Sequence, residues 1–154
     1  MAEDRPYKLY KIVNGIVIDH IPRFQALKVI RVLGVDKDHD SIVSIGTNFS
    51  SGKMGNKDVI KIENKQLTDD ELNKISIIAP TATINWIEKE TLVKKHKVEL
   101  PSILKGIVKC ANPNCITRHE DMKTIFYPIR DNDVLRLRCH YCERTFDKED
   151  VEII

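Results

Sequence analysis

The sequence predicts an α+β protein, with a ferredoxin-like (split βαβ) N-terminal domain followed by a small β-rich domain. Three observations support this prediction. Strand and helix signals alternate over the first two thirds of the 154 residues, the helical periodicity fades after Leu100-Pro101-Ser102, and all four cysteines lie beyond that point. We therefore expect one domain over residues 1–100 and a second over residues 101–154.

The first elements are predicted as two short strands and a helix. Residues 7–19 are rich in β-branched and aromatic side chains, and Asn14-Gly15 is a typical turn between two strands. Pro22 is expected to open a helix that ends at Gly34, a natural helix stop. The residues expected to share its buried face are Ala26, Leu27, Ile30 and Leu33.

The next segment has the pattern of two strands joined by a loop. Residues 41–49 alternate as a half-buried strand does, and a loop rich in Ser, Gly and Asn follows over residues 50–56. Residues 59–63 form the second short strand. The alternating positions of the first strand are Val43, Ile45, Thr47 and Phe49.

A second helix and two further strands complete the N-terminal domain. Thr68 and Glu71 form a capping box, in which each side chain can accept a hydrogen bond from the other residue's backbone N–H, and Pro80 ends the helix. Ala82, Ile84 and Trp86 alternate on a strand, with residues 91–98 as its hairpin partner. The order is β-α-β-β-α-β plus one strand, so we expect both helices on one sheet face and the other face open to a ligand or partner.

Composition narrows the class of protein. Lysine and arginine total 25 against 23 acidic residues, a net charge of +2, whereas a nucleic-acid-binding face usually brings a strong basic bias. Residues 1–6 lack the apolar core of a signal peptide, and no apolar run approaches the roughly 18 residues of a membrane helix. We therefore expect a cytoplasmic protein.

The cysteines have the spacing of a closed structural zinc site. Cys110 and Cys115 are separated by four residues, and Cys139 and Cys142 by two, so each pair can direct both sulfurs at one ion. Four thiolates leave no coordination position for a reactive water, which argues against zinc catalysis. Two disulfides, a thioredoxin-like redox pair at Cys139 and Cys142, or a ligand role for His119 or His140 are the alternatives.

No known catalytic motif is present, but one group of residues could bind phosphate. Asp19-His20 precedes the first helix, Lys57 and Lys61 lie in or beside a later strand, and Lys94-Lys95 lie in the last strand of the domain. In the split βαβ order these strands can be neighbours, so lysines could converge on phosphates as point charges. Taken one at a time, however, each lysine is more typical of a solvated surface charge, and His20 of a helix start or the surface.

Six sequence blocks resemble the regulatory chain of aspartate carbamoyltransferase, in order and over nearly the whole chain. These blocks are residues 15–22 (GIVIDHIP), 51–58 (SGKMGNKD), 60–64 (IKIEN), 79–85 (APTATIN), 110–116 (CANPNCI) and 139–142 (CHYC).

This resemblance implies a non-catalytic subunit. It implies that the N-terminal domain binds ATP, CTP or UTP and pairs with a second regulatory chain. It also implies that the zinc domain, with one Zn²⁺ per chain, docks on the catalytic chain. Regulatory dimers would then bridge catalytic trimers and control pyrimidine biosynthesis, with no contact to nucleic acid or membrane.

The resemblance also implies roles for individual residues. Asp19 and His20 would contact the sugar or phosphates, Lys61 the ribose or phosphate, and Lys95 the triphosphate. Lys57 would serve a neighbouring second nucleotide or its metal. The residues expected to line the base and sugar pocket are Ile12, Val17, Asn85, Ile87 and Leu92, and the expected metal ligands are Cys110, Cys115, Cys139 and Cys142.

Two rival functions stay open on sequence grounds. The first is a zinc ribbon that binds nucleic acid through Arg130, Arg136, Arg138 and Arg144, although acidic residues are interspersed among them. The second is an enzyme that uses Asp19-His20, for which no nucleophile or oxyanion stabiliser stands at a recognisable spacing.

Overall fold

The computed structural model describes residues 11–154, which divide into two compact units. The first unit comprises the chain up to Gln66 together with Thr81–Lys97, and the second comprises Leu67–Pro80 and Val98–Ile154. Each unit has its own sheet and its own buried core.

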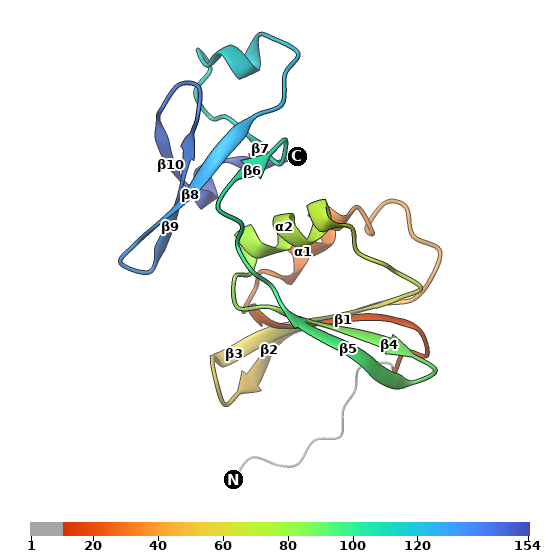
Figure 1. Ribbon diagram of the computed structural model, residues 1–154. Helices are drawn as coiled ribbons and strands as arrows, with labels where there is room; N and C mark the ends of the chain where they lie inside the picture. The colour runs from red at the N-terminus through yellow and green to blue at the C-terminus, as the bar shows by residue number, and fades with distance from the viewer. Residues whose placement is uncertain (1–10) are drawn as a thin grey trace. The chain divides into compact units, whose positions relative to one another are not determined.

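A five-stranded sheet forms the first unit (Figure 1). The strand order is β2-β3-β1-β4-β5, and every neighbouring pair is antiparallel. The first four strands have the ferredoxin-like split βαβ order, and β5 is the additional strand. The predicted fold class is therefore confirmed. The strand bounds are β1 Gly15–Pro22, β2 Val43–Ser51, β3 Gly55–Glu63, β4 Thr83–Glu88 and β5 Thr91–Lys97.

Helix α1 (Ala26–Leu33) covers one face of this sheet. Alternate strand residues point to opposite faces, and most isoleucines of the three central strands point towards α1. They pair directly across the strands, as in Ile16 with Ile62 and Ile18 with Ile60. The fully buried members of this layer are Ile16, Ile18, Ile60, Ile62 and Ile84.

Two details of the predicted first helix are wrong. Pro22 ends β1 instead of opening the helix, since its carbonyl accepts the Gln25 N–H in a turn and α1 starts only at Ala26. Leu27 is 57% exposed, whereas Val29 is fully buried. The predicted stop is confirmed, because Gly34 has a φ of 70° and its N–H bonds to the Arg31 carbonyl.

Strand β2 is more exposed than its alternating pattern predicted. It is an edge strand, and Ile45 and Phe49 remain 37% and 40% exposed. A bulge between Gly46 and Phe49 interrupts its pairing with β3, so the alternation of faces breaks within the strand. The Phe49 ring lies where a side chain at position 46 would stand, which explains the glycine there.

The predicted strand before Asn14 falls mostly on residues 1–10, outside the described residues. Lys11 and Ile12 have no regular secondary structure, and a bend follows before β1. The Val13 carbonyl accepts the Glu90 N–H, and Asn14 Oδ1 accepts the Lys89 N–H. Residues 12–14 therefore lie beside the β4–β5 turn.

Helix α2 (Asp69–Ile78) lies between β3 and β4 in sequence but belongs to the second unit. The predicted capping box is confirmed, since the Glu71 N–H donates to Thr68 Oγ1 and the Thr68 N–H donates to Glu71 Oε1. The helix ends at Ile78, ahead of Pro80 as predicted. Ile77 joins the buried core of the C-terminal residues, and Lys148 Nζ donates to its carbonyl.

Short strands make up most of the second unit (Figure 1). They form a four-stranded sheet in the order β10-β9-β8-β6 and a separate β11-β7 pair. The core includes Leu104, Phe126, Leu137 and three of the cysteines. No helix within residues 11–154 is long and apolar enough to cross a membrane. The element bounds are β6 Leu104–Lys105, β7 Val108–Lys109, η1 Ile116–Arg118, β8 Ile125–Asp131, β9 Val134–Cys139, β10 Thr145–Asp147, η2 Lys148–Asp150 and β11 Glu152–Ile153.

Removing the capping box should destabilise α2 measurably. We expect Thr68→Ala to lower the free energy of unfolding by about 1 kcal/mol, because the Glu71 N–H loses its acceptor. Urea denaturation followed by circular dichroism would measure the change. Glu71→Gln is the matched control, since glutamine completes the same box. Equal stability of Thr68→Ala and the unmodified chain would contradict a role for the cap.

Candidate functional site

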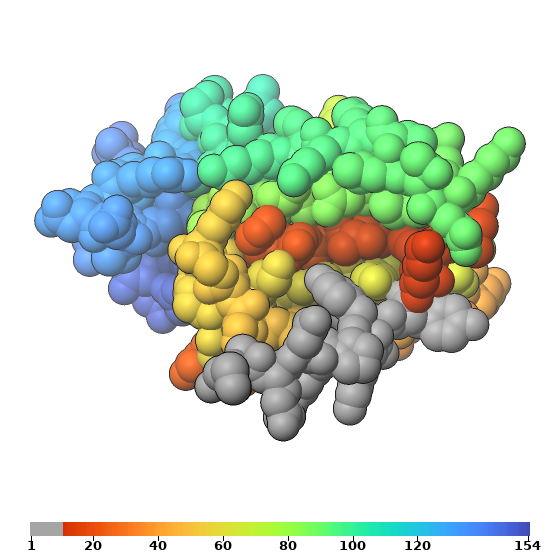
Figure 2. Space-filling view, turned by 90° about the horizontal axis from the view of Figure 1, so that it is seen from below, coloured from red at the N-terminus to blue at the C-terminus, as the bar shows by residue number. Residues whose placement is uncertain are grey.

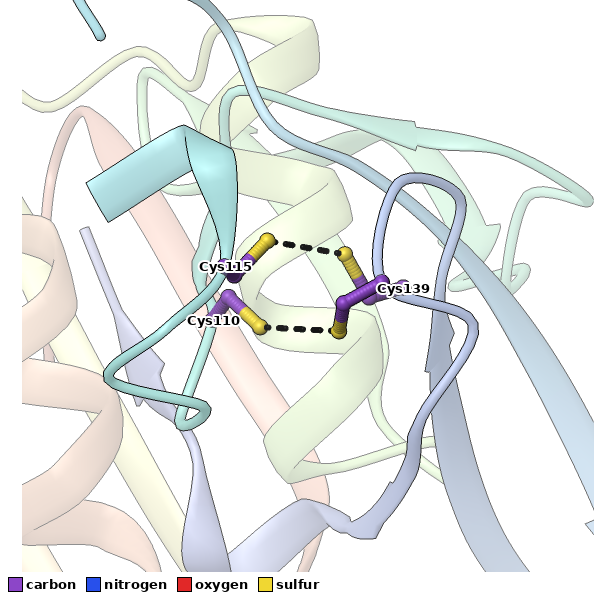
Figure 3. Close-up of side chains that lie close together, drawn as sticks. Cys110, Cys115 and Cys139 are labelled. Carbon is purple, nitrogen blue, oxygen red and sulfur yellow. Dashed lines mark hydrogen bonds between the residues drawn. The ribbon is translucent and has the colours of Figure 1, made fainter. Parts of the chain in front are cut away.

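Four cysteine sulfurs meet at one point in the second unit (Figure 3). Cys110 and Cys115 come from the segment between β7 and η1, Cys139 ends β9, and Cys142 lies in the turn before β10. All four sulfur atoms lie within 4.8 Å of one another, and three of the four residues are buried. The structure thus brings together the four residues predicted as metal ligands.

The distances between these sulfurs fit one tetrahedral metal ion. Cys110 Sγ lies 3.7 Å from Cys142 Sγ, and Cys115 Sγ lies 3.8 Å from Cys139 Sγ. A tetrahedron of thiolates with metal–sulfur bonds of about 2.3 Å has edges of about 3.8 Å. All four cysteines are free thiols in the structure, so neither disulfide pairing nor a lone redox pair describes this group. A bound ion would hold the two cysteine loops together.

The burial of these thiols affects how readily they ionise, and this in turn bears on metal binding. Burial raises the pKa of Cys110 and of Cys139. Burial also acts to raise the pKa of Cys115, but hydrogen bonds from the Thr117 hydroxyl and backbone N–H outweigh it and lower the pKa to about 7. Several buried thiolates repel one another, so full ionisation of the group requires a positive ion between them.

Neighbouring residues hold the first loop in place. The Cys115 N–H donates to the Asn112 carbonyl, and the Asn114 N–H donates to Asn112 Oδ1. Arg118 Nη1 donates to the Cys110 carbonyl at 2.9 Å. These bonds fix the backbone of the loop between the two cysteines without involving their sulfurs.

The two histidines considered as alternative ligands have other partners. His119 Nε2 lies 2.9 Å from the Pro113 carbonyl, and His140 Nδ1 lies 2.8 Å from the Tyr127 hydroxyl. Neither belongs to a metal-ligating group among residues 11–154, where the four cysteines form the group.

A second candidate site lies on the face of the N-terminal sheet that is turned away from α1. Figure 2 views this side, with β1 between the β4–β5 hairpin and β3. Four predicted site residues form one row across β3, β1, β4 and β5, because each is directly opposite the next in the strand pairing. This transverse row consists of Lys61, Val17, Asn85 and Lys95.

Charged residues gather on one side of this row, towards the Pro22 end of β1. Lys57 Nζ lies 2.8 Å from Asp19 Oδ1, and both side chains are mostly buried. Burial alone would raise the pKa of Asp19, but the hydrogen bonds from Lys57 and from the His20 N–H outweigh it and lower that pKa. Burial lowers the pKa of Lys61, so a nearby anion would stabilise its charged form.

Apolar residues lie on the other side of the row, towards the β4–β5 turn. Ile87 and Leu92 are paired across β4 and β5, and Ile12 is buried in the segment beside the turn between those strands. In the row itself, Asn85 Oδ1 is the one buried side-chain oxygen or nitrogen within residues 11–154 that has no hydrogen-bond partner. A donor on a ligand would satisfy this oxygen.

The structure places Lys94 apart from the other lysines of the predicted group, and it shows a buried acid, Asp58, next to Lys57. Lys94 pairs with Trp86 on the opposite sheet face, and its ammonium lies 4.8 Å from the centre of that ring. Asp58 was not singled out from the sequence, although it follows Lys57 directly and is fully buried. The sequence does hold one sign of its role, because Asp58 is in the same alternating series as Ile60 and Ile62 and an acid is unusual at such an inward-facing position.

Two families of known proteins match this chain, one over the N-terminal residues and one over the C-terminal residues. The family described as "Aspartate carbamoyltransferase regulatory chain, allosteric domain" matches residues 7–99. The family described as "Aspartate carbamoyltransferase regulatory chain, metal binding domain" matches residues 102–152, which contain all four cysteines.

Individual relatives match over almost their full length. The chain is 48% identical to an aspartate carbamoyltransferase regulatory chain of Pyrococcus horikoshii, covering 94% of this chain and 95% of the relative. It is 50% identical to one of Thermococcus sibiricus, covering 92% of each, and 47% identical to one of Thermoplasma volcanium, covering 97% and 98%. The relatives are named as regulatory and not catalytic chains, and the protein therefore belongs to the family of aspartate carbamoyltransferase regulatory chains.

Proposed function

We propose that this regulatory chain binds nucleoside triphosphates on the open face of its N-terminal sheet and passes their effect to aspartate carbamoyltransferase catalytic chains through a zinc-clamped C-terminal domain. In this proposal residues 1–100 form the allosteric domain and residues 101–154 the zinc domain. CTP, ATP and UTP are the effectors, and the process controlled is pyrimidine biosynthesis.

The main support for an effector site on this face is the transverse row of Lys61, Val17, Asn85 and Lys95. Both lysines occupy the same sheet face, three strand spacings or about 14 Å apart at the backbone. Two lysine side chains that reach inward from those positions could grip a phosphate chain from both sides. Asp19, held by Lys57 in its ionised form, could accept a hydrogen bond from a ribose hydroxyl.

The base would lie at the apolar end of the same face. Val17, Ile87 and Leu92 offer it an apolar surface, with Ile12 beside the β4–β5 turn. The unsatisfied Asn85 Oδ1 can accept a hydrogen bond from an amino group or ring N–H on the edge of a base. This assignment leaves His20, at the charged end, for the sugar or phosphates.

Zinc is the metal we propose, one ion per chain. Tetrahedral sites with four sulfur ligands suit zinc, and four thiolates close the coordination sphere so that the ion is structural. Its binding would contribute on the order of 10 kcal/mol to the folding of the surrounding residues. The domain it supports is the part that we propose docks on the catalytic chain, while a second regulatory chain pairs with the N-terminal domain.

Coupling between the two sites has a simple energetic requirement. An effector shifts an equilibrium between two states of the assembly only by binding one state more tightly than the other. The effector face and the catalytic centre lie on different chains, so the coupling has to pass through the C-terminal domain that joins them.

Lys95→Ala should weaken triphosphate binding about tenfold or more without unfolding the chain. A hydrogen bond to a charged group contributes about 1.5–3 kcal/mol, and Lys95 is exposed, so its removal leaves no buried gap. Isothermal titration calorimetry with CTP and with ATP would measure the change. The matched control is Lys94→Ala, on the opposite sheet face. Equal affinities of the two variants would remove Lys95 from the site.

Removing the metal should unfold the C-terminal domain and leave the N-terminal sheet folded. Hydrogen exchange should become faster in β8 and β9, and also near Ile77 of α2, because that residue packs in the same core. Cys142→Ser should have the same effect, and added Zn²⁺ should reverse the effect of a chelator on the unmodified chain. Elemental analysis should find one zinc per chain. Unchanged exchange in β8 and β9 after chelation would rule out a structural metal.

Mixing with aspartate carbamoyltransferase catalytic trimers tests the function as a whole. The metal-loaded chain should form a complex of larger mass and make the aspartate saturation curve respond to CTP and ATP. The metal-stripped chain should leave the trimers active, unassembled and unresponsive. Assembly that survives complete metal removal would contradict the docking role of the zinc domain.

A further inference from the structure

Asp58 is a fully buried carboxylate that ties three elements of the first unit together. Its Oδ2 accepts the Ala26 N–H at 3.0 Å, and its Oδ1 accepts the Asn48 N–H at 2.9 Å. Ala26 is the first residue of α1, and Asn48 lies in the β2 bulge with a φ of 62°. One side chain of β3 thus holds both the start of the helix and the irregular part of the edge strand.

The bond to Ala26 replaces a cap that the helix lacks locally. Gln25 occupies the N-cap position of α1, and its side chain makes no capping hydrogen bond. A carboxylate at a helix N-terminus satisfies a free backbone N–H and interacts favourably with the helix dipole. Asp58 supplies that carboxylate from a strand 32 residues further along the chain.

Asp58 also follows the lysine that pairs with Asp19. Successive strand residues point to opposite faces, so Lys57 reaches Asp19 on the open face while Asp58 reaches α1 on the other. Both neighbouring strands bulge at this level. The pairing of β1 with β3 is irregular between Ile18 and Ile21, where Asp19 lies, and that of β2 with β3 is irregular around Asn48.

We propose that Asp58 is a positioning residue for the effector site, acting through Lys57. The hydrogen bonds of Asp58 to the Ala26 and Asn48 N–H groups fix the position of the β3 backbone between the two bulges. The fixed backbone in turn orients the Lys57 side chain towards Asp19. Ligand binding at the Asp19–Lys57 pair is then linked to the start of α1 and to the β2 edge. This inference rests on the proposed nucleotide-binding function of the open face.

A double-mutant cycle tests whether Asp58 acts through Lys57. We expect Asp58→Asn to weaken CTP binding about tenfold in the otherwise unmodified chain, and to have no further effect when combined with Lys57→Gln. The asparagine keeps the shape of the side chain but turns an amide NH₂ towards one of the two backbone N–H groups. Asp36→Asn, at an exposed position of the same unit, is the matched control and should leave the affinity unchanged.

Two outcomes would overturn the inference. If Asp58→Asn weakens CTP binding by the same factor with and without Lys57, its effect is general destabilisation. If Asp58→Asn leaves the affinity unchanged, the residue has no positioning role. Failure of the proposed function itself would look different, because the unmodified chain would then bind neither CTP nor ATP.

Hydrogen exchange gives a second test that does not need a variant of the buried Asp58. We expect saturating CTP to slow the exchange of the Ala26 and Asn48 amides, and Lys57→Gln to abolish this slowing. Unchanged exchange at both amides, in a chain that binds CTP, would show that the effector face is not linked to α1 and β2 through Asp58.

Discussion

The meeting of four cysteine sulfurs at one point is the constraint on which the C-terminal unit depends. Three of its strands, β6, β7 and β11, have only two residues each, so backbone pairing alone holds little of it together. The cysteines come from two separate chain segments, and three of them are part of the core that contains Phe126 and Leu137. An ion bound by all four would join these segments, and in a domain of this size a metal can supply stability that a small apolar core cannot.

The N-terminal unit is organised by the burial of one sheet face against α1. Ile16, Ile18 and Ile60 are fully buried on that face, and the residues between them necessarily point the other way. A shift of one residue in the strand pairing would bring Lys61 into the core, so the isoleucines set the register strongly. The same register aligns Lys61 with Val17, Asn85 and Lys95, so the core specifies the candidate effector face.

The wrong predictions concern places where local pattern and tertiary packing disagree. A proline suits the first turn of a helix, but Pro22 pairs with Lys57 in the sheet and the helix starts later. Leu27 fits the helical period as well as Val29 does, yet only one of the two faces the sheet. The alternating residues of β2 do not become buried, because an edge strand with a bulge has a partner on one side only.

Residues close together in sequence determined several features by themselves. The Thr68–Glu71 capping box, the Gly34 helix stop and the two closely spaced cysteine pairs act over a few positions, where backbone geometry leaves little choice. The alternation of strands and helices was enough for the fold class, and the sequence blocks for the family.

Only the tertiary structure decided which residues far apart in sequence lie on the same sheet face or form a hydrogen bond with each other. Lys94 and Lys95 look alike in sequence, but the pairing of β4 with β5 places one beside Trp86 and the other beside Asn85. Asp58 reaches Ala26 because β3 lies next to β1, whose end leads into α1. Such contacts depend on the register of strands far apart in the chain, which follows from the packing of the whole core and not from any local pattern.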